Sequence, residues 1–231
     1  MTASPVHVFL PCRGGSQRVP GKNTRPFANI SGGLLELKLR QLAETKEIAS
    51  VTVNTDDPEV IHIAEGLRGI FNIPLHVSER PAELAAAGTL DDFVAYVPSV
   101  MPDGVIMWTH VTSPFFGAKE IDDAVISYRK EVENGEFDSV MGVSRIQTFL
   151  WDHRGNCVSH DRDKVKWPQT QDLDPIYEVN SAVFMIPKED MIALCDRIGH
   201  SPFLLEVGKF EAFDIDWQDD FLVAEKIYQT R

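Results

Sequence analysis

Short apolar runs alternate along this chain with segments whose apolar residues recur at helical spacing. Residues 6–10 and 104–109 are nearly continuous apolar runs, as in strands buried on both faces, and residues 34–46 and 118–133 have the helical pattern. Further strands are expected at 50–55, 73–77, 139–143, 181–186 and 210–215, and further helices at 58–67, 90–101, 188–198 and 218–229. This alternation predicts an α/β fold, a three-layer sandwich with a mostly parallel central sheet covered by helices on both faces.

The pattern is interrupted once, from residue 145 to about residue 178. Tryptophans and prolines are scattered there among charged residues, without the period of a helix or a strand. We interpret 145–178 as a small β-rich excursion of a single domain that spans residues 1–231. Excursions of this length usually serve an active site or an oligomer contact, so we expect a flap or a homodimer contact.

Composition limits the partners of the chain. The net charge of −13 at pH 7 makes nucleic acid and anionic membrane surfaces poor partners, and no apolar run approaches the roughly 20 residues of a membrane helix. The chain has an odd number of cysteines, Cys12, Cys157 and Cys195, and none are spaced as in a CxxC motif. This argues against a disulfide framework and against a zinc site, and it favours a reducing, cytoplasmic location.

The most informative segment is the basic loop, residues 11–25, which follows the first predicted strand. Its glycines allow backbone N–H groups to approach an anion closely, and its four Arg and Lys side chains add positive charge. No acidic residue precedes Glu36, although the chain contains 35 of them. The loop is not a Walker A motif, because five residues separate Gly15 from Gly21 and Asn23 stands where Ser or Thr is needed. These features predict a phosphate-binding loop, with a basic surface turn as the alternative.

Arg13, Ser16, Pro20, Lys22 and Asn23 follow the pattern Arg-x-x-Ser-x-x-x-Pro-x-Lys-Asn. The loop thereby resembles the signature of the acylneuraminate cytidylyltransferase family, the CMP-sialic acid synthetases. Further similar stretches extend over most of the chain, at 55–57, 79–85, 112–115 and 179–184.

Asp214 and Asp216 form a second candidate site near the C-terminus. Two carboxylates at positions i and i+2 of an extended segment share one face, which suits a hard cation such as Mg²⁺ held against phosphate oxygens. On its own such a pair is often solvated or caps the following helix. The resemblance implies that this pair binds the metal.

The resemblance also implies the remaining site residues. Nucleotide binding would fall to Arg13, Gly14, Gly15, Ser16, Lys22, Asn23 and Arg80, sugar binding to His110, Thr112, Ser113 and Asn180, and catalysis to Arg13, Lys22 and Asp214. His110 stands where the family usually has a sugar-contacting Gln. We expect the His110 side chain to point into the sugar pocket, with a buried structural histidine as the alternative.

The implied reaction transfers CMP from CTP to the anomeric hydroxyl of an acidic nonulosonic (sialic-acid-like) sugar and releases pyrophosphate, with Mg²⁺ as the cofactor. Fixed cations and N–H donors would stabilise the charge that moves onto pyrophosphate. The alternatives are a KDO-type or other sugar nucleotidyltransferase, and a nucleotide-binding relative without catalysis. The expected partners are these small molecules and a second copy of the chain.

Overall fold

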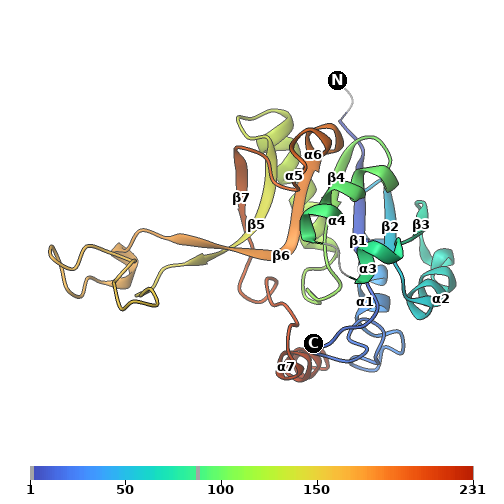
Figure 1. Ribbon diagram of the computed structural model, residues 1–231, viewed down its shortest axis with the longest axis horizontal. Coiled ribbons are helices and arrows are strands. Elements are labelled where there is room, and N and C mark those ends of the chain that lie inside the picture. Colours follow the sequence, from blue (N-terminus) through green and yellow to red (C-terminus); the bar gives the residue numbers. More distant parts are fainter. Residues whose placement is uncertain (1–2, 87–88, 231) are drawn as a thin grey trace.

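The computed structural model describes residues 3–86 and 89–230, which contain a seven-stranded sheet in the order β3-β2-β1-β4-β6-β5-β7 (Figure 1). The strands are β1 (Val6–Pro11), β2 (Ser50–Thr55), β3 (Leu75–Glu79), β4 (Val105–Trp108), β5 (Ser139–Ile146), β6 (Ile176–Pro187) and β7 (Pro202–Glu206). β6 is antiparallel to both of its neighbours, β4 and β5, and the other pairs are parallel. The predicted mostly parallel sheet is confirmed.

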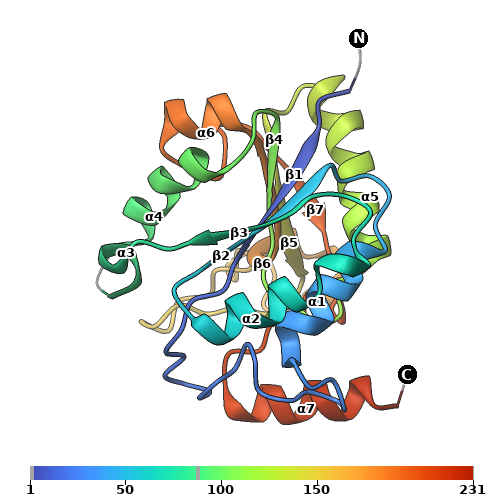
Figure 2. The same ribbon diagram turned by 90° about the vertical axis from the view of Figure 1, so that its right-hand side faces the viewer.

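Helices cover both faces of this sheet, which confirms the three-layer architecture. The helices are α1 (Gly33–Ala43), α2 (Pro58–Gly66), α3 (Ala82–Ala86), α4 (Leu90–Tyr96), α5 (Ala118–Tyr128), α6 (Lys188–Leu194) and α7 (Gln218–Tyr228). Residues of α1, α2, α5 and α7 share one hydrophobic core with the sheet, and residues of α4 and α6 share the other. Figure 2 shows the sheet between α4 and α6 on one side and α1 and α5 on the other.

Local sequence explains the strands and helix starts nearest the site. Val8, Phe9 and Leu10 of β1 are fully buried, because this central strand is covered on both faces. Asp57 caps α2 by accepting a hydrogen bond from the backbone N–H of Glu59, and Pro58 occupies the first turn, where its missing N–H costs nothing. β1 therefore fixes the start of the basic loop, and the capped start of α2 fixes the end of β2.

Several predicted elements differ from the structure. The helix predicted at 118–133 ends at Tyr128 and continues as the π-helical turn Arg129–Glu133, and the strand predicted at 181–186 is the longer β6. The segment 210–215 is not a strand; its spaced apolar residues pack on the core, and the edge strand is β7 (Pro202–Glu206) instead. The helix predicted at 188–198 ends at Leu194, where Cys195 adopts a left-handed backbone conformation with φ of 52°. The helix predicted at 90–101 ends at Tyr96 and continues as the 3₁₀ turn Val97–Val100, since Pro98 has no N–H to donate.

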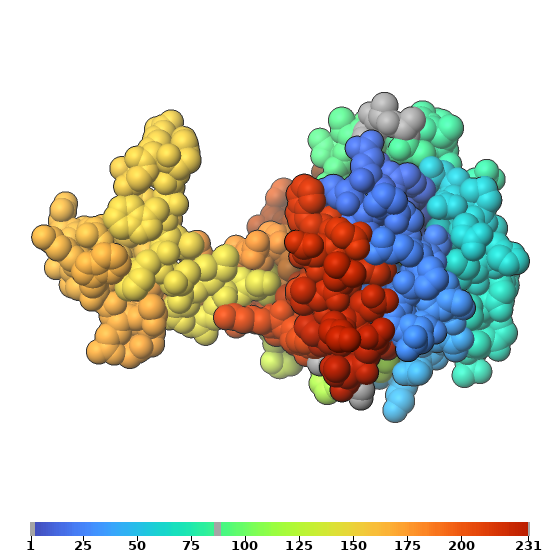
Figure 3. All heavy atoms as spheres, turned by 90° about the horizontal axis from the view of Figure 1, so that it is seen from below, coloured from blue at the N-terminus to red at the C-terminus, as the bar shows by residue number. Residues whose placement is uncertain are grey.

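The excursion projects from the body of the molecule on a stem formed by β5 and β6 (Figures 1 and 3). The antiparallel ladder ends at Ile146 and Ile176, and we call residues 147–175, beyond it, the arm. Within the arm the structure has one 3₁₀ turn, Thr170–Asp172, and an isolated bridge between Trp151 and Cys157. The expected β-rich character is therefore limited to the stem, because the arm lacks the alternating pattern that strand pairing requires.

In the part of the chain that the structure describes, no helix combines the length and the apolar character needed to cross a membrane.

Candidate active site

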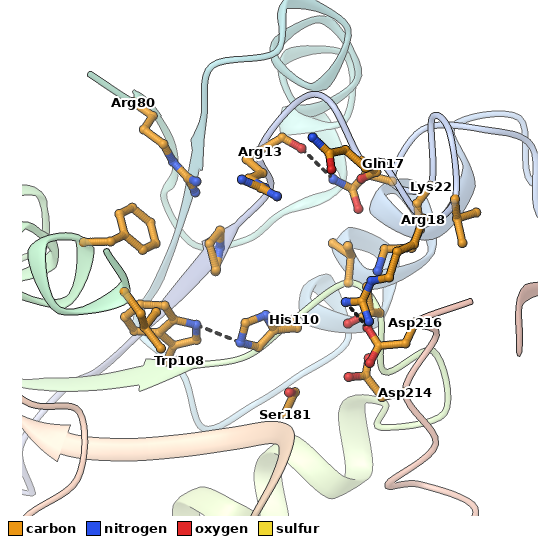
Figure 4. Close-up of a pocket in the computed structure, with 18 of the residues that line it drawn as sticks. Arg13, Gln17, Arg18, Lys22, Arg80, Trp108, His110, Ser181, Asp214 and Asp216 are labelled. Carbon is orange, nitrogen blue, oxygen red and sulfur yellow. Dashed lines mark hydrogen bonds and ion pairs between the residues drawn. The ribbon is translucent and has the colours of Figure 1, made fainter. Parts of the chain in front are cut away.

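A cavity of about 410 Å³ opens at the carboxyl ends of β1 and β4 (Figure 4). Ligands of open α/β sheets bind at this edge. The lining residues come from the basic loop, from the ends of β3 and β4, from α4, from β6, and from the segments after α6 and before α7. They are Pro11, Arg13, Ser16, Gln17, Arg18, Val19, Lys22, Asn23, Arg80, Leu90, Phe93, Trp108, His110, Val111, Thr112, Ser181, Arg197, Asp214 and Asp216.

The basic loop is held in shape by its own contacts. Asn23 donates from Nδ2 to the backbone carbonyl of Arg13 at 3.0 Å, which ties the end of the loop to its start. The Asn23 carbonyl accepts from the N–H of Leu35 at 2.9 Å, which links the loop to α1. Gly15 and Gly21 have φ of 69° and 64°, in the left-handed region of backbone conformation that residues with a Cβ rarely adopt. The loop is therefore preorganised before any ligand binds.

The loop's cations face carboxylates from distant parts of the sequence. Arg18 donates to Asp216 Oδ1 at 2.7 Å, and Lys22 Nζ donates to the carbonyl of Ile215, also at 2.7 Å. Burial lowers the pKa of Lys22, while the nearby Asp214 and Asp216 oppose that shift. Gly14 N–H donates to Asp56 Oδ1 at 2.9 Å. The absence of acids in the N-terminal sequence thus does not extend to the space around the loop.

Asp214 and Asp216 lie together at the cavity wall next to Lys22 and Arg18 (Figure 4). The backbone between them is fixed, because the N–H of Ile215 donates to the carbonyl of Thr112 at 2.9 Å. Asp214 Oδ1 is buried and has no hydrogen-bond partner, and burial raises the pKa of this carboxyl. Such an orphaned oxygen beside a second carboxylate fits a small, hard cation.

No group of three or more His, Cys, Asp or Glu side chains suited to a metal occurs within residues 3–86 and 89–230. Two carboxylates alone match the way Mg²⁺ is usually held when substrate phosphates supply the other oxygens. Asp214 and Asp216 are therefore the residues that would hold Mg²⁺ together with a bound triphosphate.

His110 lies at the centre of the cavity, between Trp108 and the basic loop (Figure 4). Its Nε2 accepts a hydrogen bond from the indole N–H of Trp108 at 2.9 Å. Burial, with a further contribution from the charge of Arg197, lowers the pKa of His110 to about 3, so the ring is neutral at pH 7. Because Trp108 can only donate, the proton of the neutral ring resides on Nδ1. His110 thus offers the cavity an N–H donor.

Arg80 is almost fully buried at the opposite wall of the cavity. Its Nε donates to Asn54 Oδ1 at 2.9 Å, and its guanidinium lies 4.1 Å from the centre of the Phe93 ring. The Asn54 side chain and the Phe93 ring together fix the orientation of the Arg80 guanidinium.

The structure brings most of the sequence-predicted site residues together. Arg13, Ser16, Lys22, Asn23, Arg80, His110, Thr112, Asp214 and Asp216 line the cavity, and Gly14 and Gly15 line an adjoining hollow that shares Arg13 and Arg80.

Ser113 and Asn180 do not line either of these hollows. Ser113 is buried, and the amide oxygen of Asn180 accepts the N–H of Ala182 at 3.2 Å while its Nδ2 donates to Ser144 Oγ at 3.3 Å. Ser181, one residue later in β6, faces the cavity instead. Successive strand residues point to opposite faces of the sheet, so the Asn180 side chain lies on the face of β6 that is turned away from the cavity.

Sequence reasoning did not identify Arg197 and Trp108 as site residues. Trp108 lies within a buried strand, where an aromatic residue signals only a core position. Arg197 follows α6 in an irregular segment that carries no motif. Only the packing of α6 against the sheet brings Arg197 to the cavity.

The family model for cytidylyltransferases matches residues 7–231. Among solved structures, the chain is similar to CMP:2-keto-3-deoxy-manno-octonic acid synthetase complexed with CTP, with 12% identity, a TM-score of 0.66, and coverage of 98% of this chain and 99% of that one. It is also similar to 4-diphosphocytidyl-2C-methyl-D-erythritol synthase from Anaerococcus prevotii, with 11% identity, a TM-score of 0.68, and coverage of 97% and 98%. A search of curated proteins found no match.

The structural similarities support the fold, and the family model covers nearly the whole chain, including the basic loop and both aspartates. They do not single out the acylneuraminate branch that the loop motif resembles. The chain belongs to the cytidylyltransferase family, and it is therefore a nucleotidyltransferase.

Proposed function

We propose that this protein transfers a cytidylyl group from CTP to the anomeric hydroxyl of an acidic keto sugar and releases pyrophosphate. The observation that carries this proposal is the meeting of Arg13, Lys22, Asp214 and Asp216 around one cavity at the carboxyl end of the sheet. Cations that bind phosphate oxygens and carboxylates that hold a divalent ion are the two groups that this chemistry requires.

In the reaction, the anomeric hydroxyl gives up its proton to the surrounding water, its oxygen forms a bond to the α-phosphorus of CTP, and the bond from that phosphorus to the pyrophosphate oxygen breaks. Negative charge moves onto pyrophosphate, and Arg13 and Lys22, which line the cavity, would stabilise it. Mg²⁺, held by Asp214 and Asp216, would neutralise further charge on the phosphate oxygens. Arg18 pairs with Oδ1 of Asp216 at 2.7 Å, and the second carboxylate oxygen, Oδ2, would be the one to contact the metal.

The acceptor we favour is a nonulosonic, sialic-acid-like sugar, because five positions of the basic loop match that branch. A KDO-type acceptor is the second candidate. It is favoured by the structural similarity of the whole chain to CMP:2-keto-3-deoxy-manno-octonic acid synthetase. Both acceptors carry a carboxylate beside the anomeric carbon, so both would require the cavity to bind an anionic group in addition to the triphosphate.

The test is an assay of CTP-dependent pyrophosphate release over a panel of eight- and nine-carbon keto acid sugars, with neutral hexoses as controls. We expect turnover with at least one acid, dependent on Mg²⁺, and none in the Asp214→Ala variant. Tight CTP binding by the wild type without turnover on any acceptor would favour the non-catalytic relative. Turnover on neutral sugars alone would contradict the acidic acceptor.

We also propose that the arm joins two copies of the chain. Trp151 and Trp167 in the arm are 48% and 66% exposed, and Ile176, Tyr177 and Val179 expose further apolar surface on the stem. Exposed apolar surface concentrated on a projecting segment is typical of an interaction site. A second copy with the same arm would cover it symmetrically.

Sedimentation velocity tests this interface. We expect the wild type to sediment at twice the mass of the chain and the Trp167→Glu variant to sediment as a monomer. Leu222→Glu is the matched control, because Leu222 is 52% exposed on α7, away from the arm. A monomeric wild type would contradict the dimer, and a dimeric Trp167→Glu variant would remove Trp167 from its interface.

A further inference from the structure

Arg197 is a cation in the cavity that the proposed mechanism does not use. It follows α6, in a segment where the left-handed Cys195 ends the helix and redirects the chain. The backbone N–H groups of Arg197 and Ile198 both donate to Asp196 Oδ1, at 2.6 and 3.3 Å, which fixes the turn that carries the arginine. The conformation of this turn is therefore fixed locally, and the packing of α6 on the sheet places the turn at the cavity.

The Arg197 guanidinium is held by aromatic rings rather than by an acceptor. Its central carbon lies 4.0 Å from the centre of the Phe184 ring and 5.1 Å from the centre of the Trp108 ring. Within the described residues, no oxygen atom accepts a hydrogen bond or forms an ion pair with this guanidinium. Burial lowers the pKa of Arg197 from its very high ordinary value, and a guanidinium stays charged at neutral pH. A half-buried cation of this kind is expected to bind an anion.

Arg197 lies apart from the cations of the basic loop. Phe9, Trp108 and Phe184 form one row across β1, β4 and β6, as the strand register shows. Neighbouring strands are about 4.8 Å apart, so Phe184 lies about 10 Å from β1, which leads into the basic loop. The Arg197 guanidinium packs on the β6 end of this row. The triphosphate and the ligand of Arg197 would therefore occupy different parts of the cavity.

A second N–H donor lines the same cavity. His110 is bound to Trp108 through Nε2, which leaves its Nδ1–H for a ligand, and Arg197 packs on the same Trp108 ring. The planar fork of N–H groups of Arg197 suits a carboxylate, which has two acceptor oxygens, and the His110 N–H is a further donor in the same cavity. Ser181, which lies on the Asp214 side of His110 in Figure 4, adds a hydroxyl group for an acceptor sugar.

We propose that Arg197 binds the anionic group of the acceptor, a carboxylate, with the Nδ1–H of His110 as a second donor. This proposal rests on the proposed function for the identity of the acceptor as a keto acid sugar. It assigns acceptor selection to a residue after α6 and leaves the basic loop to the nucleotide. Arg197 is then a specificity-determining residue that contacts the carboxylate beside the anomeric carbon, whereas the basic loop contacts the phosphates.

The experiment compares Arg197→Met with the wild type on each acidic acceptor and on the matched carboxamide, in which the charge is removed from the substrate. We expect Arg197→Met to lower kcat/KM for the acid by about 10- to 100-fold, the range for a charge-assisted hydrogen-bonded pair. On the carboxamide, the variant and the wild type should differ by less than about threefold, because the partner of Arg197 is already absent. The KM for CTP should be unchanged.

Two further variants test whether the role of Arg197 is merely structural. Arg197→Lys keeps the charge but loses the fork, so it should recover part of the preference for the acid over the carboxamide. Arg68→Met removes an exposed arginine that pairs with Glu65 and should leave kcat/KM unchanged on both acceptors. If Arg197→Met keeps the wild-type preference for the acid, or weakens CTP binding instead, the proposal is overturned.

The panel also includes a sugar or polyol phosphate and its dephosphorylated form. Wild-type activity on phosphates only, with a preference that Arg197→Met abolishes, would refute the keto acid acceptor and keep Arg197 as the anion-binding residue. Activity on acids with an unchanged preference in the variant would refute the role of Arg197 and keep the acceptor. Activity on neutral acceptors alone would refute both.

Discussion

Lys38 of α1 is fully buried beneath the site, and replacing it with methionine should change how stability depends on pH. Lys38 Nζ donates to the carbonyls of Ser113 and Phe116, at 2.9 and 2.5 Å. These carbonyls belong to the loop after β4, in which the Thr112 carbonyl also accepts the N–H of Ile215 between the two site aspartates. A neutral amine has two N–H donors, which matches the two carbonyls that Lys38 contacts.

Burial lowers the pKa of Lys38 from 10.5 to about 7. Between these two pH values the unfolded chain binds a proton that the folded protein does not, so wild-type stability falls as the pH falls from 10.5 to 7. Below pH 7 both states are protonated and the effect is constant. At about 1.4 kcal/mol for each pH unit, the full range corresponds to on the order of 5 kcal/mol, and the interval from pH 7.5 to 9.5 to about 3 kcal/mol.

The assay is urea unfolding of the wild type and Lys38→Met at several pH values from 7 to 9.5. The variant loses two hydrogen bonds at every pH, but it lacks the titrating amine, so its stability relative to the wild type should fall by about 3 kcal/mol between pH 7.5 and 9.5. Lys46→Met, at an exposed lysine just after α1, is the control and should follow the wild type. Parallel curves for wild type and Lys38→Met would refute a neutral Lys38.

Three further predictions concern the site itself. Asp214→Asn should abolish turnover while leaving the protein at least as stable at pH 7 by urea unfolding, because burial raises the pKa of Asp214 and its ionised form costs stability once the pH exceeds the unfolded value of about 3.9. Full activity would exclude Asp214 from catalysis. Lys22→Ala should weaken CTP binding, measured by calorimetry, by about 1.5–3 kcal/mol. Unchanged affinity would favour the alternative interpretation of the basic loop as a surface turn. His110→Gln should change the ranking of acceptor sugars by kcat/KM without changing CTP affinity, because an amide offers both a donor and an acceptor where the ring offers one N–H; an unchanged ranking would leave His110 as a structural histidine.

The parts of this protein that the sequence alone determined are those encoded within one element. The buried runs of β1 and β4 identify central strands, because burial on both faces needs continuous apolar residues. The basic loop follows β1 directly, so the strand, the glycines and the cations that predict a phosphate-binding loop all lie in one continuous segment of the sequence. The ends of short strands are less certain, since spaced apolar residues such as those at 210–215 pack on the core without pairing.

The tertiary structure decided which side chains meet. Arg18 and Asp216 form an ion pair although they are 198 positions apart. Asn180 and Ser181 illustrate the same limit within one strand, because a shift of one residue exchanges the face toward the cavity for the face toward the core. Arg197 belongs to no motif, and it enters the site only because α6 packs over β4 and β6 and brings its guanidinium onto Trp108 and Phe184. Local periodicity determines what an element is, whereas the long-range packing of elements determines which of its side chains share a cavity.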